Sequence, residues 1–144
     1  GFRDRPFRVL HLCIDPGREA LAARIDRRAE VMIEAGLRRE VRDLRERGYG
    51  AELKPMQSIG YRHIQPVVDG ADTLVNALAS MKTDTRRFAR RQRTWIRAVP
   101  GVHWHDPADA EAIVRRVEAF LEGEDEGEAA GEGAEAVASH PSSG

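Results

Sequence analysis

Residues 85–97 carry six arginines and no carboxylate, and this stretch constrains the fold more than any other part of the chain. Four of the arginines fall on one face of an α-helix, at steps of four, three and four residues: Arg86, Arg90, Arg93 and Arg97. Apolar residues fall on another face at compatible spacing: Leu78, Met81, Phe88 and Trp95. We therefore predict a long helix from about Thr73 to Arg97, which docks by its apolar face and presents its arginines outward.

This row of arginines indicates an anionic partner. Each guanidinium offers a planar fork of donors that matches phosphate and stays charged. Like charges at i, i+4 each cost a few tenths of a kcal/mol, and no acid within 85–97 compensates them. The alternative is an ordinary solvated face, but such a face usually mixes charges of both signs.

Charge divides the chain into two regions. Six acidic residues and no lysine or arginine lie in 123–144, which is rich in Gly and Ala, so we expect an acidic disordered tail there. The remaining 18 acidic residues face 23 lysines and arginines, so residues 1–122 carry about +5 and form the folded region. The single cysteine, Cys13, excludes a disulfide framework, and no apolar run is long enough to span a membrane. We expect a cytoplasmic protein.

Residues 8–14 have the apolar, β-branched pattern of a short buried strand. One strand cannot satisfy its own backbone donors and acceptors, and no later segment is an obvious partner, so we predict that it joins a sheet the chain does not supply. Asp15 is then expected to cap a helix that has Pro16 at its first position and ends at Gly36.

Three further elements are expected. A helix should run from about Leu37 to Arg47, and another from about Asp109 to Leu121. Between them, residues 57–62 should form a loop that leads into a short helical turn, kinked or ended by Pro66. In 103–105 two histidines flank Trp104; we interpret this as a packed tryptophan between surface histidines rather than a metal site, since no third ligand is nearby.

The loop at 57–62 has two interpretations. Gly60 allows a close backbone approach to a ligand, Tyr61 can stack, and Arg62 can pair with phosphate. The same residues also suit a plain helix-start loop with a packed tyrosine. Elsewhere the sequence contains no Gly-x-x-x-x-Gly-Lys-Ser/Thr loop, no Gly-x-Ser-x-Gly elbow and no zinc-ligand spacing, so it offers no catalytic residue of its own.

Four motifs in series resemble the tRNA dimethylallyltransferase (isopentenyltransferase) family, over about residues 7–106. They are Arg18-Glu19-x-Leu21-x-x-Arg24-Ile25-x-x-Arg28, Gly36-Leu37-x-x-Glu40-Val41-x-x-Leu44, Ile59-Gly60-Tyr61-Arg62 and Thr85-Arg86-x-x-Ala89-Arg90-Arg91-Gln92-x-Thr94-Trp95-x-Arg97. Arg90 stands where the family often has lysine, and Phe88 where it often has tyrosine; both changes keep the chemistry. The match is to the C-terminal part of such an enzyme.

The resemblance implies a mainly α-helical part of a P-loop-type α/β transferase, with one strand that joins a parallel sheet. It implies transfer of a dimethylallyl group from dimethylallyl diphosphate to N6 of the adenine next to the anticodon, position 37, with Mg²⁺ as cofactor. The target base must be extruded to reach the donor. The P-loop and the catalytic aspartate belong to the family's N-terminal half, so we expect the chain alone to be inactive and to bind neither Mg²⁺ nor the diphosphate with any assignable residue.

The resemblance also implies which residues contact the anticodon stem-loop of the tRNA. Two weaker candidates, Arg24 and Arg28, would face the diphosphate end of the channel. No membrane or DNA partner is implied. The expected tRNA-binding residues are Gln57, Ser58, Ile59, Gly60, Tyr61 and Arg62, followed by Arg90, Arg91, Gln92, Arg93, Thr94, Trp95, Ile96 and Arg97.

Two alternatives differ in class from a transferase part. The first is a non-catalytic RNA-binding helical module, which would have to cover Val9, Leu12 and Ile14 within the chain. The second is a helical interaction protein that uses 86–97 for an acidic protein or a membrane surface; membrane-lying helices usually expose a larger apolar face than Phe88 and Trp95 provide.

Overall fold

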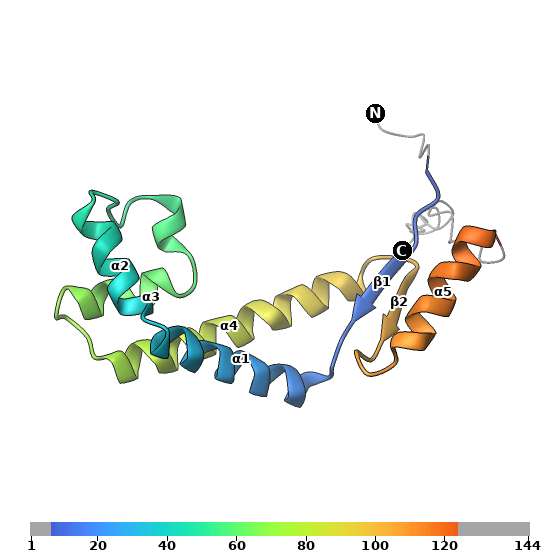
Figure 1. Cartoon of the computed structure of the whole chain (residues 1–144), viewed down its shortest axis with the longest axis horizontal. Coiled ribbons are helices and arrows are strands. Elements are labelled where there is room, and N and C mark those ends of the chain that lie inside the picture. Colours follow the sequence, from blue (N-terminus) through green and yellow to red (C-terminus); the bar gives the residue numbers. More distant parts are fainter. Residues whose placement is uncertain (1–6, 124–144) are drawn as a thin grey trace, which may run out of the picture.

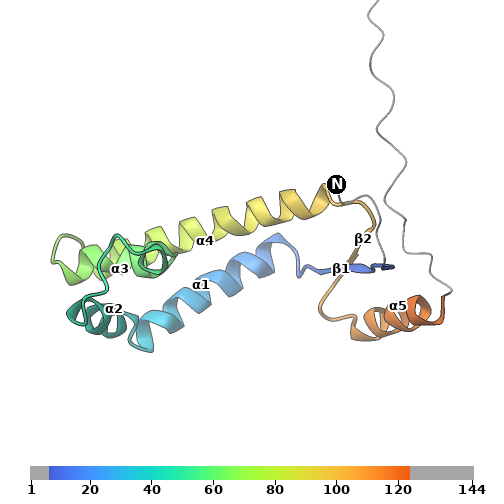
Figure 2. The same cartoon turned by 90° about the horizontal axis from the view of Figure 1, so that it is seen from above.

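The computed structural model of the chain describes residues 7–123 and is elongated (Figure 1). Two long helices, α1 (Arg18–Glu34) and α4 (Leu74–Arg97), run side by side through the molecule (Figure 2). At one end they join a helical head that contains α2 (Leu37–Glu46), the 3-10 helix η1 (Lys54–Gln57) and α3 (Tyr61–Val68). At the other end lie β1 (His11–Ile14), β2 (Val102–His105) and α5 (Ala110–Glu122).

Helix α4 begins and ends within one residue of the prediction. The Thr73 hydroxyl accepts a hydrogen bond from the Asn76 N–H (3.2 Å) and so caps the first turn. Helix α5 is capped in the same way, because the Asp109 carboxylate accepts from the Ala112 N–H (3.2 Å). The boundaries of these two helices follow from their capping residues.

The predicted start of α1 is wrong. Gly17, with φ 85°, is the N-cap, and neither Asp15 nor Pro16 belongs to the helix. The Asp15 carboxylate instead accepts the Gly17 N–H through Oδ1 (3.0 Å) and binds Arg93 through Oδ2 (2.7 Å). Since both carboxylate oxygens are engaged, neither can cap the first turn of α1.

The hydrophobic core lies in the helical head, where α2 and α3 pack on the facing halves of α1 and α4. Its most buried side chains are Val41 and Ile64, both with 0% exposure. Helix α3 continues past Pro66 to Val68, and at its start Gly60 has φ 104° and lies against Met32, Leu37 and Met81. The buried apolar residues are Ala29, Leu37, Val41, Met56, Ile64, Val67, Ala77 and Met81.

The strand predicted at 8–14 is shorter and has a partner within the chain. β1 pairs in parallel with β2, with His11 opposite Val102 and Ile14 opposite His105. The expectation that the chain supplies no partner is therefore wrong; residues 102–105 are too short to be recognised as a strand from their pattern. Trp104 is exposed while His103 and His105 are half-buried, which reverses the interpretation of this segment.

The expected fold class is confirmed: the described chain is mainly helical, with a small parallel sheet. Between residues 7 and 123, no helix combines the length and apolarity that a membrane crossing requires. The boundary expected between a folded region and an acidic tail cannot be compared with the structure, because 124–144 lie outside the described residues.

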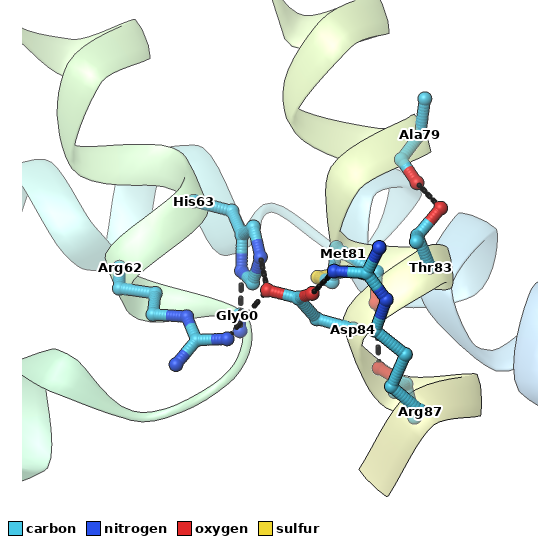
Figure 3. A network of polar contacts seen from close by, with 9 residues as sticks. Gly60, Arg62, His63, Ala79, Met81, Thr83, Asp84 and Arg87 are labelled. Carbon is cyan, nitrogen blue, oxygen red and sulfur yellow. Dashed lines mark hydrogen bonds and ion pairs between the residues drawn. The ribbon is translucent and has the colours of Figure 1, made fainter.

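A polar network joins α3 to α4 on the surface of the head (Figure 3). The Asp84 carboxylate accepts from Arg62 Nη2 (2.5 Å) and lies 3.2 Å from His63 Nε2 and 3.5 Å from Arg87 Nη1. His63 Nδ1 accepts the Gly60 N–H (3.3 Å), so in the neutral ring Nε2 carries the proton and donates to Asp84. The Arg62 hydrogen bond, and then the His63 hydrogen bond, hold the pKa of Asp84 below its usual range.

Replacing Ile64 by alanine is expected to destabilise the head by about 2–5 kcal/mol, because the wild-type side chain is completely buried and a cavity remains. Urea denaturation followed by circular dichroism measures the loss. The control is Val75→Ala on α4, where the side chain is 77% exposed and the change should stay within about 0.5 kcal/mol. Equal losses in the two variants would contradict the assignment of the core.

Asp84→Asn is expected to lower the stability of the folded chain at pH 7. It is also expected to make that stability depend less on pH in the acid range. Because the folded-state pKa of Asp84 is lowered, its contribution is present above the unfolded pKa of about 3.9 and is lost as pH falls through the folded pKa. Melting temperatures from pH 7 to pH 3 measure this. Glu118→Gln, which removes an exposed carboxylate without an ion pair in 7–123, should keep the wild-type profile; an unchanged profile in Asp84→Asn would refute the linkage.

Candidate nucleic-acid interface

A cleft of about 490 Å³ lies between the N-terminal half of α1 and the C-terminal half of α4, and we call it the α1–α4 cleft. Its floor is apolar, with Leu21 and Ile25 from α1 and Ala89 from α4. Guanidinium groups from both helices surround this floor. The complete lining is Arg18, Leu21, Ala22, Ile25, Arg86, Ala89, Arg90, Arg93, Thr94 and Arg97.

All four arginines of the predicted row line this cleft, so the row faces α1 rather than open solvent. Helix α1 and the residues just before it supply the acids that 85–97 lacks. Arg86 binds Asp26 through two nitrogens, with Nε 3.0 Å from Oδ1 and Nη2 on Oδ2. Arg93 binds Asp15 at 2.7 Å. The expectation of an uncompensated row is therefore wrong for two of its four members.

A third ion pair continues the series toward the head. Lys82 Nζ of α4 lies 2.6 Å from Glu30 Oε1 of α1, and the hydrogen bond and charge of Lys82 lower the pKa of Glu30. We call the three pairs Lys82–Glu30, Arg86–Asp26 and Arg93–Asp15 the α1–α4 ion-pair ladder. From one pair to the next the residue number of the cation rises while that of the acid falls, as expected for two chain segments that run antiparallel.

Three cleft arginines have no such partner. Arg18, Arg90 and Arg97 are exposed, and within residues 7–123 none of them makes an ion pair. All three line the cleft together with the apolar residues Leu21, Ile25 and Ala89. This arrangement suits an anion that carries more than one phosphate, because separate guanidinium groups can engage separate phosphates.

Phe88 and Trp95 do not dock α4 as predicted. They are 45% and 70% exposed, and the Arg91 guanidinium lies 5.8 Å from the centre of the Phe88 ring. Leu78 and Met81 do pack in the head, because α2 and α3 cover only the first half of α4. Beyond Asp84 the same face of the helix is open within the described chain.

The other predicted segment, 57–62, lies at the start of α3. Gly60 is buried and Ile59 packs on the core, whereas Gln57 and Ser58 are exposed. Tyr61 donates a hydrogen bond to Glu40, which together with burial raises the pKa of the Tyr61 hydroxyl. Arg62 meets α4 at Asp84, before the 90–97 segment begins, so the structure does not merge the two predicted segments into one site.

Arg24 and Arg28 are exposed on α1 and do not line the cleft. Arg18 does line it but was absent from the predicted set. Its spacing carried a usable signal, because 18, 21, 22 and 25 share one helix face. No sequence pattern indicates that Asp15 and Asp26 form ion pairs with α4, since their partners lie far along the sequence.

Within the part of the chain that the structure describes, no three His, Cys, Asp or Glu side chains gather closely enough to hold a metal ion. Cys13 next to the cleft is partly buried, and burial, followed by the charge of Asp15, raises the pKa of its thiol.

Comparison with known proteins agrees with these motifs. The family model described as IPP transferase matches residues 2–99. The tRNA dimethylallyltransferase of Desulfatibacillum aliphaticivorans is 48% identical over 122 residues, which are 85% of this chain and 40% of that protein. The corresponding protein of Syntrophobacter fumaroxidans is 44% identical over 116 residues, 81% of this chain and 34% of that protein.

Two solved structures share the fold. The full-length tRNA isopentenylpyrophosphate transferase from Bacillus halodurans superposes with a TM-score of 0.73 at 32% identity, over 84% of this chain and 40% of that one. The transferase from Staphylococcus epidermidis gives 0.71 at 27% identity, over 85% and 39%. The chain thus spans about 40% of the length of such relatives. Since the family model covers residues 2–99 of 144, the chain belongs to the IPP transferase family, that of the tRNA dimethylallyltransferases.

Proposed function

We propose that this chain is the tRNA-binding part of a tRNA dimethylallyltransferase. The observation that carries the proposal is the α1–α4 cleft, which is lined by five arginines, three of them without an acidic partner in 7–123. Its ligand would be the anticodon stem-loop, whose phosphates are the natural partners of such forks. Family membership supports the same substrate class.

The reaction proposed for the complete enzyme joins N6 of the adenine next to the anticodon to C1 of a dimethylallyl group. The bond between C1 and the diphosphate oxygen breaks, diphosphate leaves, and N6 gives up a proton to a base. In this chain we assign no residue to that base. Our proposal is that the segments 57–62 and 90–97 hold the RNA, with Arg93 of the second segment kept in its ion pair with Asp15. We propose further that Arg24 and Arg28 lie toward the diphosphate end, and that the transfer step uses groups outside these 144 residues.

The small sheet supports a chain that works together with additional strands. Parallel sheets are normally covered on both faces and contain more than two strands. Here β1 and β2 pair only with each other within the described residues, and Ile14 of β1 is 57% exposed. Exposure of Val9 and Ile14 also counts against the alternative of a self-sufficient RNA-binding module, which should cover them.

The chain is expected to bind an anticodon stem-loop RNA with adenine 3′ of the anticodon, and to lose affinity steeply as salt rises. Arg90→Glu/Arg97→Glu should weaken binding by more than about tenfold, because it reverses two cationic groups at the cleft. Fluorescence anisotropy across a salt series measures both effects.

The matched control is Arg38→Glu/Arg39→Glu, which makes the same charge change at two exposed positions of α2. This control should bind within about twofold of wild type at physiological salt, where charges remote from the ligand are screened. Equal weakening in the two double variants would mean that net charge, not the cleft, drives binding. No binding by the wild-type chain would refute the proposal.

Incubating the chain with dimethylallyl diphosphate, Mg²⁺ and the stem-loop is expected to give no dimethylallyl-adenine, because we place the transfer chemistry outside the chain. Mass spectrometry of the digested RNA detects the added group. The full-length relative from Desulfatibacillum aliphaticivorans serves as the positive control. Measurable transfer by the chain alone would overturn this part of the proposal.

A further inference from the structure

We infer that the anion-binding groups of the α1–α4 cleft are Arg18, Arg90 and Arg97, and that Asp26 and Asp15 hold Arg86 and Arg93 as walls of the cleft. This inference rests on the proposed function and divides its arginine row into two kinds of residue. Along α4 the two kinds alternate: Arg86 and Arg93 are paired with acids, whereas Arg90 and Arg97 make no ion pair with residues 7–123.

Arg93 is the clearest wall residue. Its side chain is 19% exposed and that of Asp15 is 13% exposed, so the pair is largely removed from solvent. Asp15 is itself fixed, because its second carboxylate oxygen accepts the Gly17 N–H and its own N–H donates to the His105 carbonyl (2.9 Å). Arg93 Nε is buried and has no acceptor in the described residues. The charge of Arg93 is thus already offset by a fixed carboxylate.

Arg86 is occupied in a different way. Its Nε and Nη2 atoms both bind the Asp26 carboxylate, which uses the side of the guanidinium fork best suited to a bidentate acceptor. The pair carries no net charge toward a ligand. Arg86 therefore helps to form the side of the cleft but adds little positive electrostatic potential to it.

Arg90 has no acidic partner within 7–123, because the α1–α4 ion-pair ladder is interrupted opposite it. Glu30 faces Lys82 and Asp26 faces Arg86, so one further antiparallel turn brings position 22 to face Arg90. Position 22 is an alanine, and Ala22 and Arg90 line the cleft together. The small, uncharged side chain leaves this guanidinium available to a ligand.

Arg18 and Arg97 complete the set from opposite helices. Arg18 is the first residue of α1 and Arg97 the last of α4, so both stand at the end of the cleft nearest the sheet. With Arg90 they surround the apolar floor formed by Leu21 and Ile25. Guanidinium groups from both helices can engage separate phosphates of one single-stranded loop.

The test measures the slope of log binding constant against log salt for the anticodon stem-loop. Arg18→Gln, Arg90→Gln and Arg97→Gln should each make the slope shallower by about 0.7–0.9, the value for one lost phosphate contact. Arg86→Gln and Arg93→Gln should leave the slope unchanged. If Arg93→Gln does not fold, Arg93→Lys is used in its place, because it keeps the positive charge beside Asp15. Circular dichroism checks that each variant is folded.

A second pair of variants tests the interruption of the ladder directly. Ala22→Asp should pair with Arg90 and reduce the slope as much as Arg90→Gln does, and combining the two changes should add no further reduction. The matched control is Ala23→Asp, which adds the same charge at an exposed neighbouring position and should leave the slope unchanged. Equal effects of Ala22→Asp and Ala23→Asp would overturn the pairing geometry.

Titration calorimetry with inorganic diphosphate at low salt separates this inference from the proposed function. Diphosphate binding that is lost in Arg18→Gln but kept in Arg93→Gln, with no RNA binding, would sustain the inference and refute the function. RNA binding with equal slope changes in Arg90→Gln and Arg93→Gln would sustain the proposed function and refute the inference. No binding of either ligand by the wild-type chain would overturn both.

Discussion

The α1–α4 ion-pair ladder is the interaction on which the rest of this structure depends. Beyond the head, α1 and α4 bury few apolar side chains. There Arg86 of α4 pairs with Asp26 of α1, and Arg93 pairs with Asp15 just before α1 (2.7 Å), while Lys82–Glu30 (2.6 Å) lies beside the core residues Ala29 and Met81. Exposed ion pairs contribute little individually, but the Arg93–Asp15 pair is mostly buried, and breaking such a pair is costly. Since Asp15 follows β1, this pair also fixes the sheet relative to α4.

The head and the cleft are therefore held by different forces. The head has a conventional apolar core around Val41 and Ile64, and the Asp84 network only fastens its surface. The cleft end relies on ion pairs of α4 with Asp15 and Asp26. High salt should weaken the more exposed Arg86–Asp26 pair more than the Arg93–Asp15 pair, because salt screens buried pairs less.

Local features could be predicted from the sequence, and long-range pairings could not. The extent of α4 followed from the Thr73 cap and the helical spacing, and the mainly helical class from the motifs. The β1–β2 pairing was missed because residues 102–105 carry too little pattern to indicate a strand. The ladder was missed for a related reason: residues 85–97 contain no acid, and nothing local shows that Asp15 and Asp26 lie opposite Arg93 and Arg86.

This distinction explains why counting arginines misjudges the site. A row of four unpaired guanidinium groups on one helix would repel itself and destabilise α4. Pairing every member would remove the field that attracts an anion. The structure does neither: Asp15 and Asp26 neutralise alternate members, while Ala22 offers Arg90 no acidic partner among the described residues. Paired arginines then hold the helices at a fixed separation, and the unpaired ones face a cleft whose width is already set, which lowers the entropic cost of binding a phosphate chain.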